Sequence, residues 1–161
     1  MRGQSLLMKG AFDLNDFDAI YETSKQMRHG NTLMGYQPQP RVANEMLIKL
    51  VRQSHDPALY DYALYLLDGK GGFVKNDFLA LNLLEESFEV HGNADAAFIA
   101  AVIRNEALVP GTKDEQRIGE LITFAVLNKV KGASEYQAQY IDSGHWRSLN
   151  VRYWKDWLAN Q

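Results

Sequence analysis

Cysteine is missing from the 161-residue chain, and its absence excludes a disulfide framework, a thiolate metal site and a cysteine nucleophile. Histidine is scarce, and no two histidines stand in the H-x₃-H or H-E-x-x-H spacing that brings both to one metal ion. The sequence also lacks a G-x-S-x-G motif and a P-loop. Adjacent carboxylates such as Glu85 and Glu86 are more typical of a solvated helix face than of an acid–base pair. We therefore expect no catalytic residue, no metal and no cofactor.

Neither a charge excess nor a long apolar run is present. The 17 basic and 20 acidic residues leave a formal net charge of −3, without the clustered lysines and arginines of a nucleic-acid-binding surface. Near the start, the apolar trio Leu6–Leu7–Met8 is too short for a signal-peptide core or a membrane span. With 46% hydrophobic and 23% charged residues, the composition is that of a globular protein. We expect a cytoplasmic chain, or a periplasmic one if a signal was removed, that binds neither nucleic acid nor membrane.

The strongest positive signal is an internal repeat. When the segment that begins at Ala58 is shifted by 38 residues, from 58 to 96, apolar or small residues coincide in two successive stretches. The coinciding pairs include Ala58 and Ala96, Ala63 and Ala101, Ala80 and Ile118, Leu83 and Leu121, and Leu84 and Ile122. Two stretches in register at one shift indicate a repeated structural unit.

Within each unit the apolar spacing is helical. The i, i+3, i+4, i+7, i+8 stripe of an amphipathic helix is formed by Ala80, Leu83, Leu84, Ser87 and Phe88. Glycine and proline separate the stripes, and Asn76 and Asp114 stand where two helices would be capped. The sequence therefore predicts an all-α fold of about seven or eight helices.

The repeat predicts a single domain over residues 1–161. Its parts are a degenerate N-terminal repeat at 15–55, two clear repeats at 56–92 and 93–132, and a half repeat plus cap at 133–161. In the degenerate repeat, helices are expected at 15–28 and 41–54.

A last helix is expected at 148–160. Its apolar stripe consists of Val151, Trp154, Trp157 and Leu158. Because a stack of repeats leaves an apolar face open at its end, this stripe is expected to cover that face. Trp146 precedes the helix, which leaves it as a candidate for binding, since tryptophan is favoured at binding sites.

The hairpin between the two helices of the central unit resembles a known family. After Ala58-x₃-Tyr62-Ala63-x₂-Leu66, the chain continues as Gly69-x-Gly71 and Val74-Lys75-Asn76-Asp77. This pattern resembles the Sel-one-like repeat, a relative of the tetratricopeptide repeat with a slightly longer unit, over roughly two thirds of the chain. The next unit departs from it, with Arg104 where a large apolar residue is usual. The resemblance implies a short right-handed α-solenoid of helix–turn–helix repeats that holds a protein or peptide on its concave face.

The predicted binding face follows from positions of the first helices that the repeat leaves outside the core. Apolar residues at such positions, with a polar edge, are typical of an interface. The predicted binding residues are Leu59, Asp61, Leu64, Ile99, Val102, Gln137, Gln139 and Trp146. The alternative is a more tightly wound stack in which the apolar members are buried.

Two classes of function remain open. The first is a protein-interaction module, either an adaptor or a small inhibitor, with a bacterial immunity protein that neutralises a toxin as an alternative. The second is an enzyme with a site built onto a helical stack, which the lack of a catalytic constellation disfavours. A purely structural fragment of a larger assembly is a third and weaker interpretation.

Overall fold

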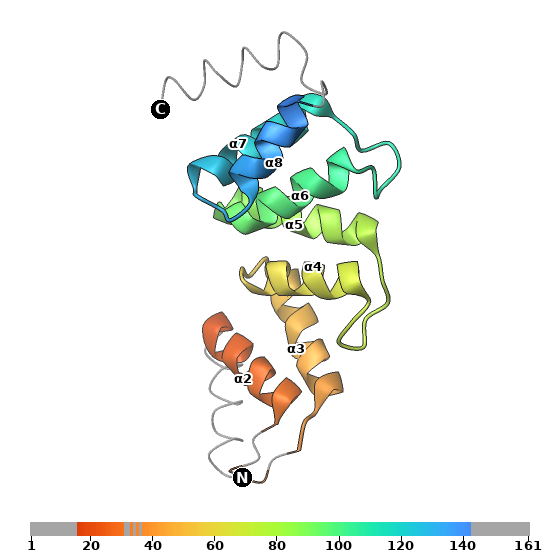
Figure 1. The fold of residues 1–161 in the computed structure, drawn as a ribbon. Coiled ribbons are helices and arrows are strands. Elements are labelled where there is room, and N and C mark those ends of the chain that lie inside the picture. The colour runs from red at the N-terminus through yellow and green to blue at the C-terminus, as the bar shows by residue number, and fades with distance from the viewer. Residues whose placement is uncertain (1–15, 31–32, 34, 36, 143–161) are drawn as a thin grey trace. The chain divides into compact units, whose positions relative to one another are not determined.

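The computed structural model describes residues 16–30, 33, 35 and 37–142, and within them the chain forms seven α-helices and no strand (Figure 1). The helices are α2 (Phe17–His29), α3 (Pro40–Arg52), α4 (Ala58–Asp68), α5 (Asp77–His91), α6 (Ala94–Asn105), α7 (Glu115–Leu127) and α8 (Ala133–Asp142). The all-α prediction is confirmed. The expected helix at 148–160 and Trp146 lie outside the described residues.

Short polar side chains mark the helix starts. Asp16 accepts a hydrogen bond from a first-turn N–H of α2 at 3.0 Å. The two caps predicted from the sequence, Asn76 and Asp114, do the same for α5 and α7 at 3.0 and 3.2 Å. α3 begins with Pro40, whose missing N–H would have no partner in a first turn anyway. Both helices expected in the degenerate repeat are therefore present, with ends shifted by one or two residues.

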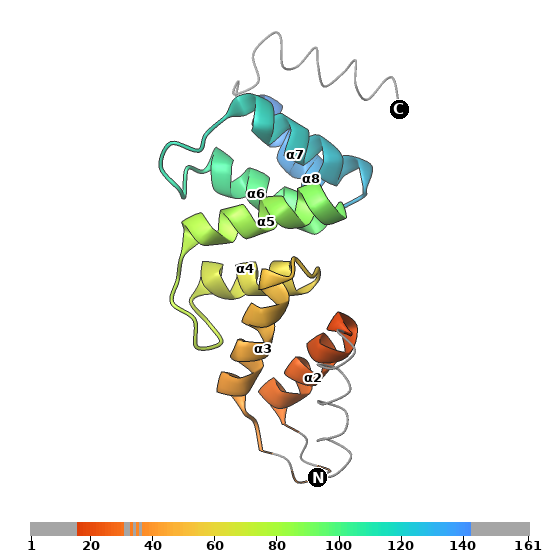
Figure 2. The same cartoon turned by 180° about the vertical axis from the view of Figure 1, so that it is seen from behind.

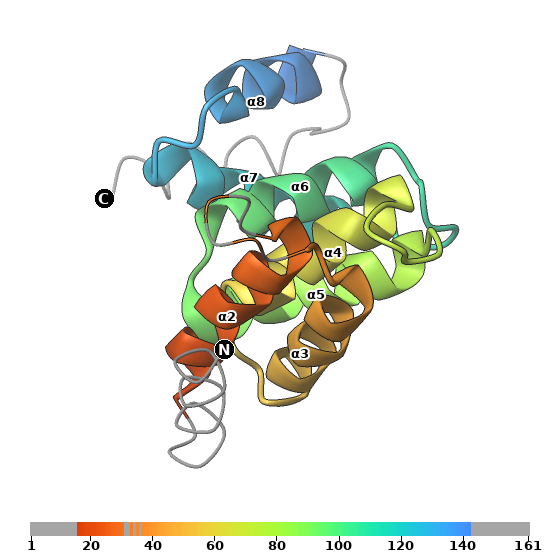
Figure 3. The same ribbon diagram turned by 90° about the horizontal axis from the view of Figure 1, so that it is seen from below.

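The chain divides into two compact units, with the boundary inside α5 between Leu83 and Leu84. In the first unit α2 packs along α3, and α3 packs against α4 (Figures 2 and 3). Its core is formed by Ile20, Met27, Ala43, Met46, Leu47, Leu50 and Ala58. The α3 residues recur every three or four positions and the two α2 residues lie seven positions apart, as expected for two amphipathic helices packed face to face.

In the second unit α6 packs along α7, and α7 packs against α8. Small residues of α6 and large residues of α7 share the interior: Ala96, Ala100, Ala101, Ile118, Leu121 and Ile122 are all fully buried. The core positions that the repeat predicts for both helices are confirmed. Alanines on one helix let the partner helix approach closely, so the larger side chains of α7 fill the space between them.

The finer features of the predicted architecture stay predictions: the solenoid arrangement, its handedness and the repeat boundaries. Within the residues that the structure describes, no helix has both the length and the apolar character needed to cross a membrane.

Candidate binding site

The prediction that Leu59 faces outward is wrong, because its side chain is 0% exposed. α4 begins only a few residues after α3 ends, so its first turn is enclosed in the corner between the two helices. Ala58 and Leu59 are both fully buried there. The buried arc of α4 is thus wider than the stripe that the repeat pattern assigns to it.

The other predicted binding residues are divided between the two units. Asp61 and Leu64 are half-buried and line one pocket of the first unit. In the second unit Ile99 and Val102 are half-buried and lie one turn apart on α6. On α8 the side chain of Gln137 is half-buried, and that of Gln139 is exposed. A face that joins the two sets stays a prediction.

The pocket of the first unit, which we call the α2–α4 groove, has a volume of about 230 Å³. From α2 it is lined by the i, i+3, i+4, i+7, i+8 stripe of Tyr21, Ser24, Lys25, Arg28 and His29. The remaining lining residues are Leu47 of α3 and Asp61, Leu64 and Tyr65 of α4. One continuous face of α2 therefore lies opposite one face of α4, with an α3 leucine between them.

At one end of the groove Tyr21 joins α2 to α4. Its hydroxyl donates a hydrogen bond to Oδ2 of Asp61 at 2.5 Å. Burial of the phenol, followed by the hydrogen bond to this carboxylate, raises the pKa of Tyr21 far above its ordinary value. The phenol therefore remains a hydrogen-bond donor to Asp61.

At the other end Arg28 is held by groups without charge. Its guanidinium lies 4.7 Å from the ring centroid of Tyr65, at the distance of a cation–π contact. Nη2 donates to Oδ1 of Asn44 at 2.5 Å, and Nη1 donates a long bond of 3.5 Å to the carbonyl of Gly71. Asn44 donates to the same carbonyl at 2.8 Å. The arginine is thus oriented, yet both of the oxygens that accept from it within the described residues are neutral.

The G-x-G pattern of the hairpin after α4 has a structural reason. Both Gly69 and Gly71 have left-handed φ angles, +65° and +68°, which glycine adopts without the steric cost that a side chain would bring. A Cβ on Gly71 would lie 3.0 Å from Cδ1 of Tyr65 and 3.2 Å from Nη1 of Arg28. The second glycine therefore lets the hairpin carbonyl reach Arg28 and Asn44 without displacing the tyrosine ring.

Lys25 adds a second cation to the α2 side. Its Nζ lies 5.0 Å from the ring centroid of Tyr21 and 3.3 Å from Oε1 of Glu22. Because Lys25 and Glu22 are both solvent-exposed, their ion pair is weak. The groove therefore carries cations on α2 and a single carboxylate, Asp61, on α4.

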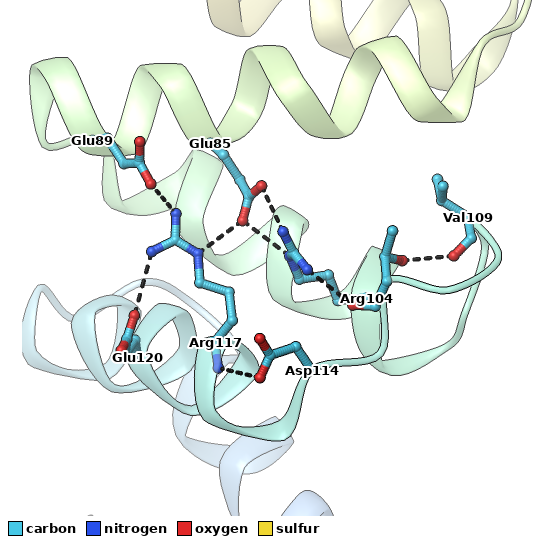
Figure 4. Close-up of polar contacts among 8 residues, drawn as sticks. Glu85, Glu89, Arg104, Val109, Asp114, Arg117 and Glu120 are labelled. Atoms are coloured by element: carbon cyan, nitrogen blue, oxygen red, sulfur yellow. Dashed lines mark hydrogen bonds and ion pairs between the residues drawn. The ribbon is translucent and has the colours of Figure 1, made fainter.

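In the second unit the main polar cluster is centred on Glu85 (Figure 4). Arg104 of α6 donates to both carboxylate oxygens at 3.0 and 2.8 Å, and Nε of Arg117 on α7 donates at 2.9 Å. The Glu85 side chain is 14% exposed. Burial acts to raise the pKa of Glu85, but the hydrogen bonds from the two arginines outweigh it and leave the pKa below its ordinary value.

The expectation that Glu85 belongs to a solvated face is therefore wrong. Arg104 bridges α5 and the loop after α6, where it donates to the carbonyl of Thr112 at 3.0 Å. Arg117 additionally pairs with Glu89 and Glu120. Since every charge in this cluster has a partner inside the unit, we interpret it as a structural brace.

Apart from Asp61 and Leu64, the groove residues were not predicted from the sequence, among them Tyr21, Lys25 and Arg28 of α2. The signal that could have found them is their shared stripe on α2, because residues at i, i+4 and i+7 lie on one side of a helix. The repeat match is weakest over this helix, so the comparison between units did not point to it.

Comparisons with protein-family models, with curated proteins and with solved structures gave no match. The resemblance to the Sel-one-like repeat thus stays a prediction. Within the described part of the chain, no group of three or more histidine, aspartate or glutamate side chains is arranged to hold a metal ion.

Proposed function

We propose that this chain is a protein-interaction module, an adaptor or a small inhibitor, that binds a peptide segment of its partner in the α2–α4 groove. The observation that carries the proposal is the groove itself, which contains Asp61 and Leu64, two of the residues that the repeat pattern predicted for binding. Tyrosine and arginine, which are enriched among residues that dominate binding energy, line it together with two leucines.

The size of the groove favours a peptide over a whole cofactor. Its volume of about 230 Å³ is below the roughly 300–1,000 Å³ of most small-molecule sites. A space of this size suits a few side chains of a longer segment, with the rest of the segment outside it. The apolar floor and polar ends match the usual composition of a protein interface.

We infer in addition that the helix pairs belong to a short right-handed solenoid of Sel-one-like repeats. The left-handed glycines of the G-x-G hairpin and the fully buried alanines at repeat positions, such as Ala63 and Ala101, support this inference. In such a stack the first helices line one surface, to which Ile99 and Val102 would contribute.

The test is a selection of short random peptides on the full chain, followed by affinity measurements with a labelled synthetic peptide. We expect Leu64→Asp to weaken binding about tenfold or more, because it places a charge on the apolar lining of the groove. Val90→Asp is the matched control, since Val90 is an exposed apolar residue of α5 outside the groove. It should leave the affinity within about twofold.

Failure to select any peptide, or equal affinity of the Leu64→Asp variant, would refute the proposal. Thermal melting shows whether the variant is folded. If it is not, Lys25→Glu repeats the test at an exposed position on the groove. The wider predicted face is tested separately by Val102→Asp, which should weaken binding only if the partner also contacts α6.

A further inference from the structure

We infer that the segment bound in the α2–α4 groove carries an aspartate or glutamate side chain, whose carboxylate pairs with Arg28, next to an apolar residue. This inference rests on the proposed function and adds to it the chemical class of the ligand.

Charge is unevenly distributed along the groove. Asp61 is bound to Tyr21 at one end, and Arg28 is stacked on Tyr65 at the other. Tyr21 and Arg28 are seven residues apart on α2, which corresponds to a rise of roughly 10 Å. The groove therefore has one end where a carboxylate is already present and another where a positive charge meets only neutral acceptors.

The Arg28 guanidinium is half-buried, and its described hydrogen-bond acceptors are neutral. A half-buried charge is costly when its neighbours do not compensate it, and within the described residues its hydrogen bonds go to an amide oxygen and a backbone carbonyl. These two bonds use two of the five N–H groups that a guanidinium carries. The remaining N–H groups can donate to a carboxylate, whose two oxygens match the planar fork of a guanidinium.

Arg28 is already oriented before a ligand arrives. The Tyr65 ring holds one face of the guanidinium, and Asn44 holds one edge. Asn44 is itself fixed by its bond to Gly71. A side chain that is already ordered loses less conformational freedom on binding, which favours affinity and selectivity.

The lining of the groove favours a ligand with a single carboxylate flanked by apolar structure. Leu47 and Leu64 line the same groove as Arg28, which provides room for an apolar side chain. Asp61 lies within the groove, and Glu22 lies beside Lys25. A polyanion such as a nucleic-acid backbone would meet repulsion from these two carboxylates, whereas an acidic side chain near Arg28 would not.

The experiment starts from peptides selected on the full chain. We expect aspartate or glutamate to be enriched beside an aliphatic residue. In a selected peptide, replacing that acid by its amide should weaken binding to the native chain about tenfold or more, because a charge-assisted hydrogen bond is lost. With the Arg28→Gln variant the same replacement should change the affinity by less than about threefold.

Two further variants serve as controls. Arg52→Gln removes an arginine charge from the exposed end of α3, outside the groove, and should preserve the preference for the acidic peptide. Arg28→Lys keeps the charge but loses the fork, so it should show an intermediate preference. If Arg28→Gln fails to fold, Arg28→Lys still tests the inference, because an unchanged preference would contradict it.

The outcomes separate this inference from the proposed function. If no peptide is selected, both are refuted. If peptides bind and Leu64→Asp abolishes binding, but the peptides show no acidic preference, the proposed function stands and the inference is overturned. The inference is also overturned if the acid-to-amide effect is as large in Arg28→Gln as in the native chain, because the carboxylate is then bound elsewhere.

Discussion

Arg28 in the first unit and Arg104 in the second are both half-buried arginines, yet their surroundings differ. Arg104 donates twice to the carboxylate of Glu85, whereas the described acceptors of Arg28 are neutral and border a groove. An arginine neutralised inside the fold can act only as a brace. An arginine oriented by neutral groups keeps its charge for a ligand, and this difference leads us to assign binding to the first unit.

The largest expected effect is the loss of stability when the Glu85 carboxylate is removed from the polar cluster. Glu85→Gln would leave Arg104 and Arg117 without the carboxylate they share, and should lower the free energy of unfolding by roughly 2–4 kcal/mol, as when one partner of a largely buried pair is removed. Urea unfolding measures the loss. Glu86→Gln is the matched control on the adjacent position, where we expect less than about 0.5 kcal/mol. Equal losses in the two variants would show that Glu85 is no brace.

The next largest loss of stability is expected from larger side chains placed in the interior. Ala63 of the first unit and Ala101 of the second are both fully buried, so replacing either by leucine should cost about 1–3 kcal/mol. Ala138→Leu, at an exposed position of α8, is the control and should have little effect. If thermal melting is unchanged for both buried positions, the helix register assigned to the repeats is wrong.

A smaller difference in stability is expected when alanine replaces one or the other of two glycines with the same backbone conformation. Gly71 and Gly92 have φ angles of +68° and +66°, but only at Gly71 would a Cβ meet neighbouring atoms, those of Tyr65 and Arg28. Alanine at either position should cost about 1–2 kcal/mol for the left-handed backbone. Gly71→Ala should cost about 1 kcal/mol more because of the close contact.

Peptide affinity sharpens the comparison of the two glycines. Gly71→Ala displaces the groups that orient Arg28, so it should weaken peptide binding, whereas Gly92→Ala should not. Urea unfolding and fluorescence anisotropy on the two variants measure both effects. Equal stability and affinity in the two variants would mean that the hairpin does not position the arginine.

The fold was largely predictable because it rests on local patterns. The stripe at Ala80 to Phe88 and the caps Asn76 and Asp114 depend on spacing and side-chain chemistry alone. The site was less predictable because it depends on which helices meet. Leu59 is buried by the corner between α3 and α4, and Glu85 is paired with arginines 19 and 32 positions away along the chain. Separations of this size leave no periodic signal in a single sequence.

The smallest expected effect is the pH dependence of the unfolding free energy that comes from Glu85. The two arginines lower the pKa of Glu85 in the folded chain relative to an exposed glutamate, whose pKa is about 4.3. The unfolded chain therefore binds a proton at Glu85 before the folded chain does, so the stability from Glu85 is present above that value and is lost as the pH falls through the folded-state pKa.

Glutamine at position 85 cannot titrate. The difference in unfolding free energy between the native chain and Glu85→Gln should thus shrink as the pH is lowered from about 6 toward about 3. Urea unfolding at a series of pH values measures this difference, and a difference that stays constant would mean that the arginines do not favour the charged form of Glu85.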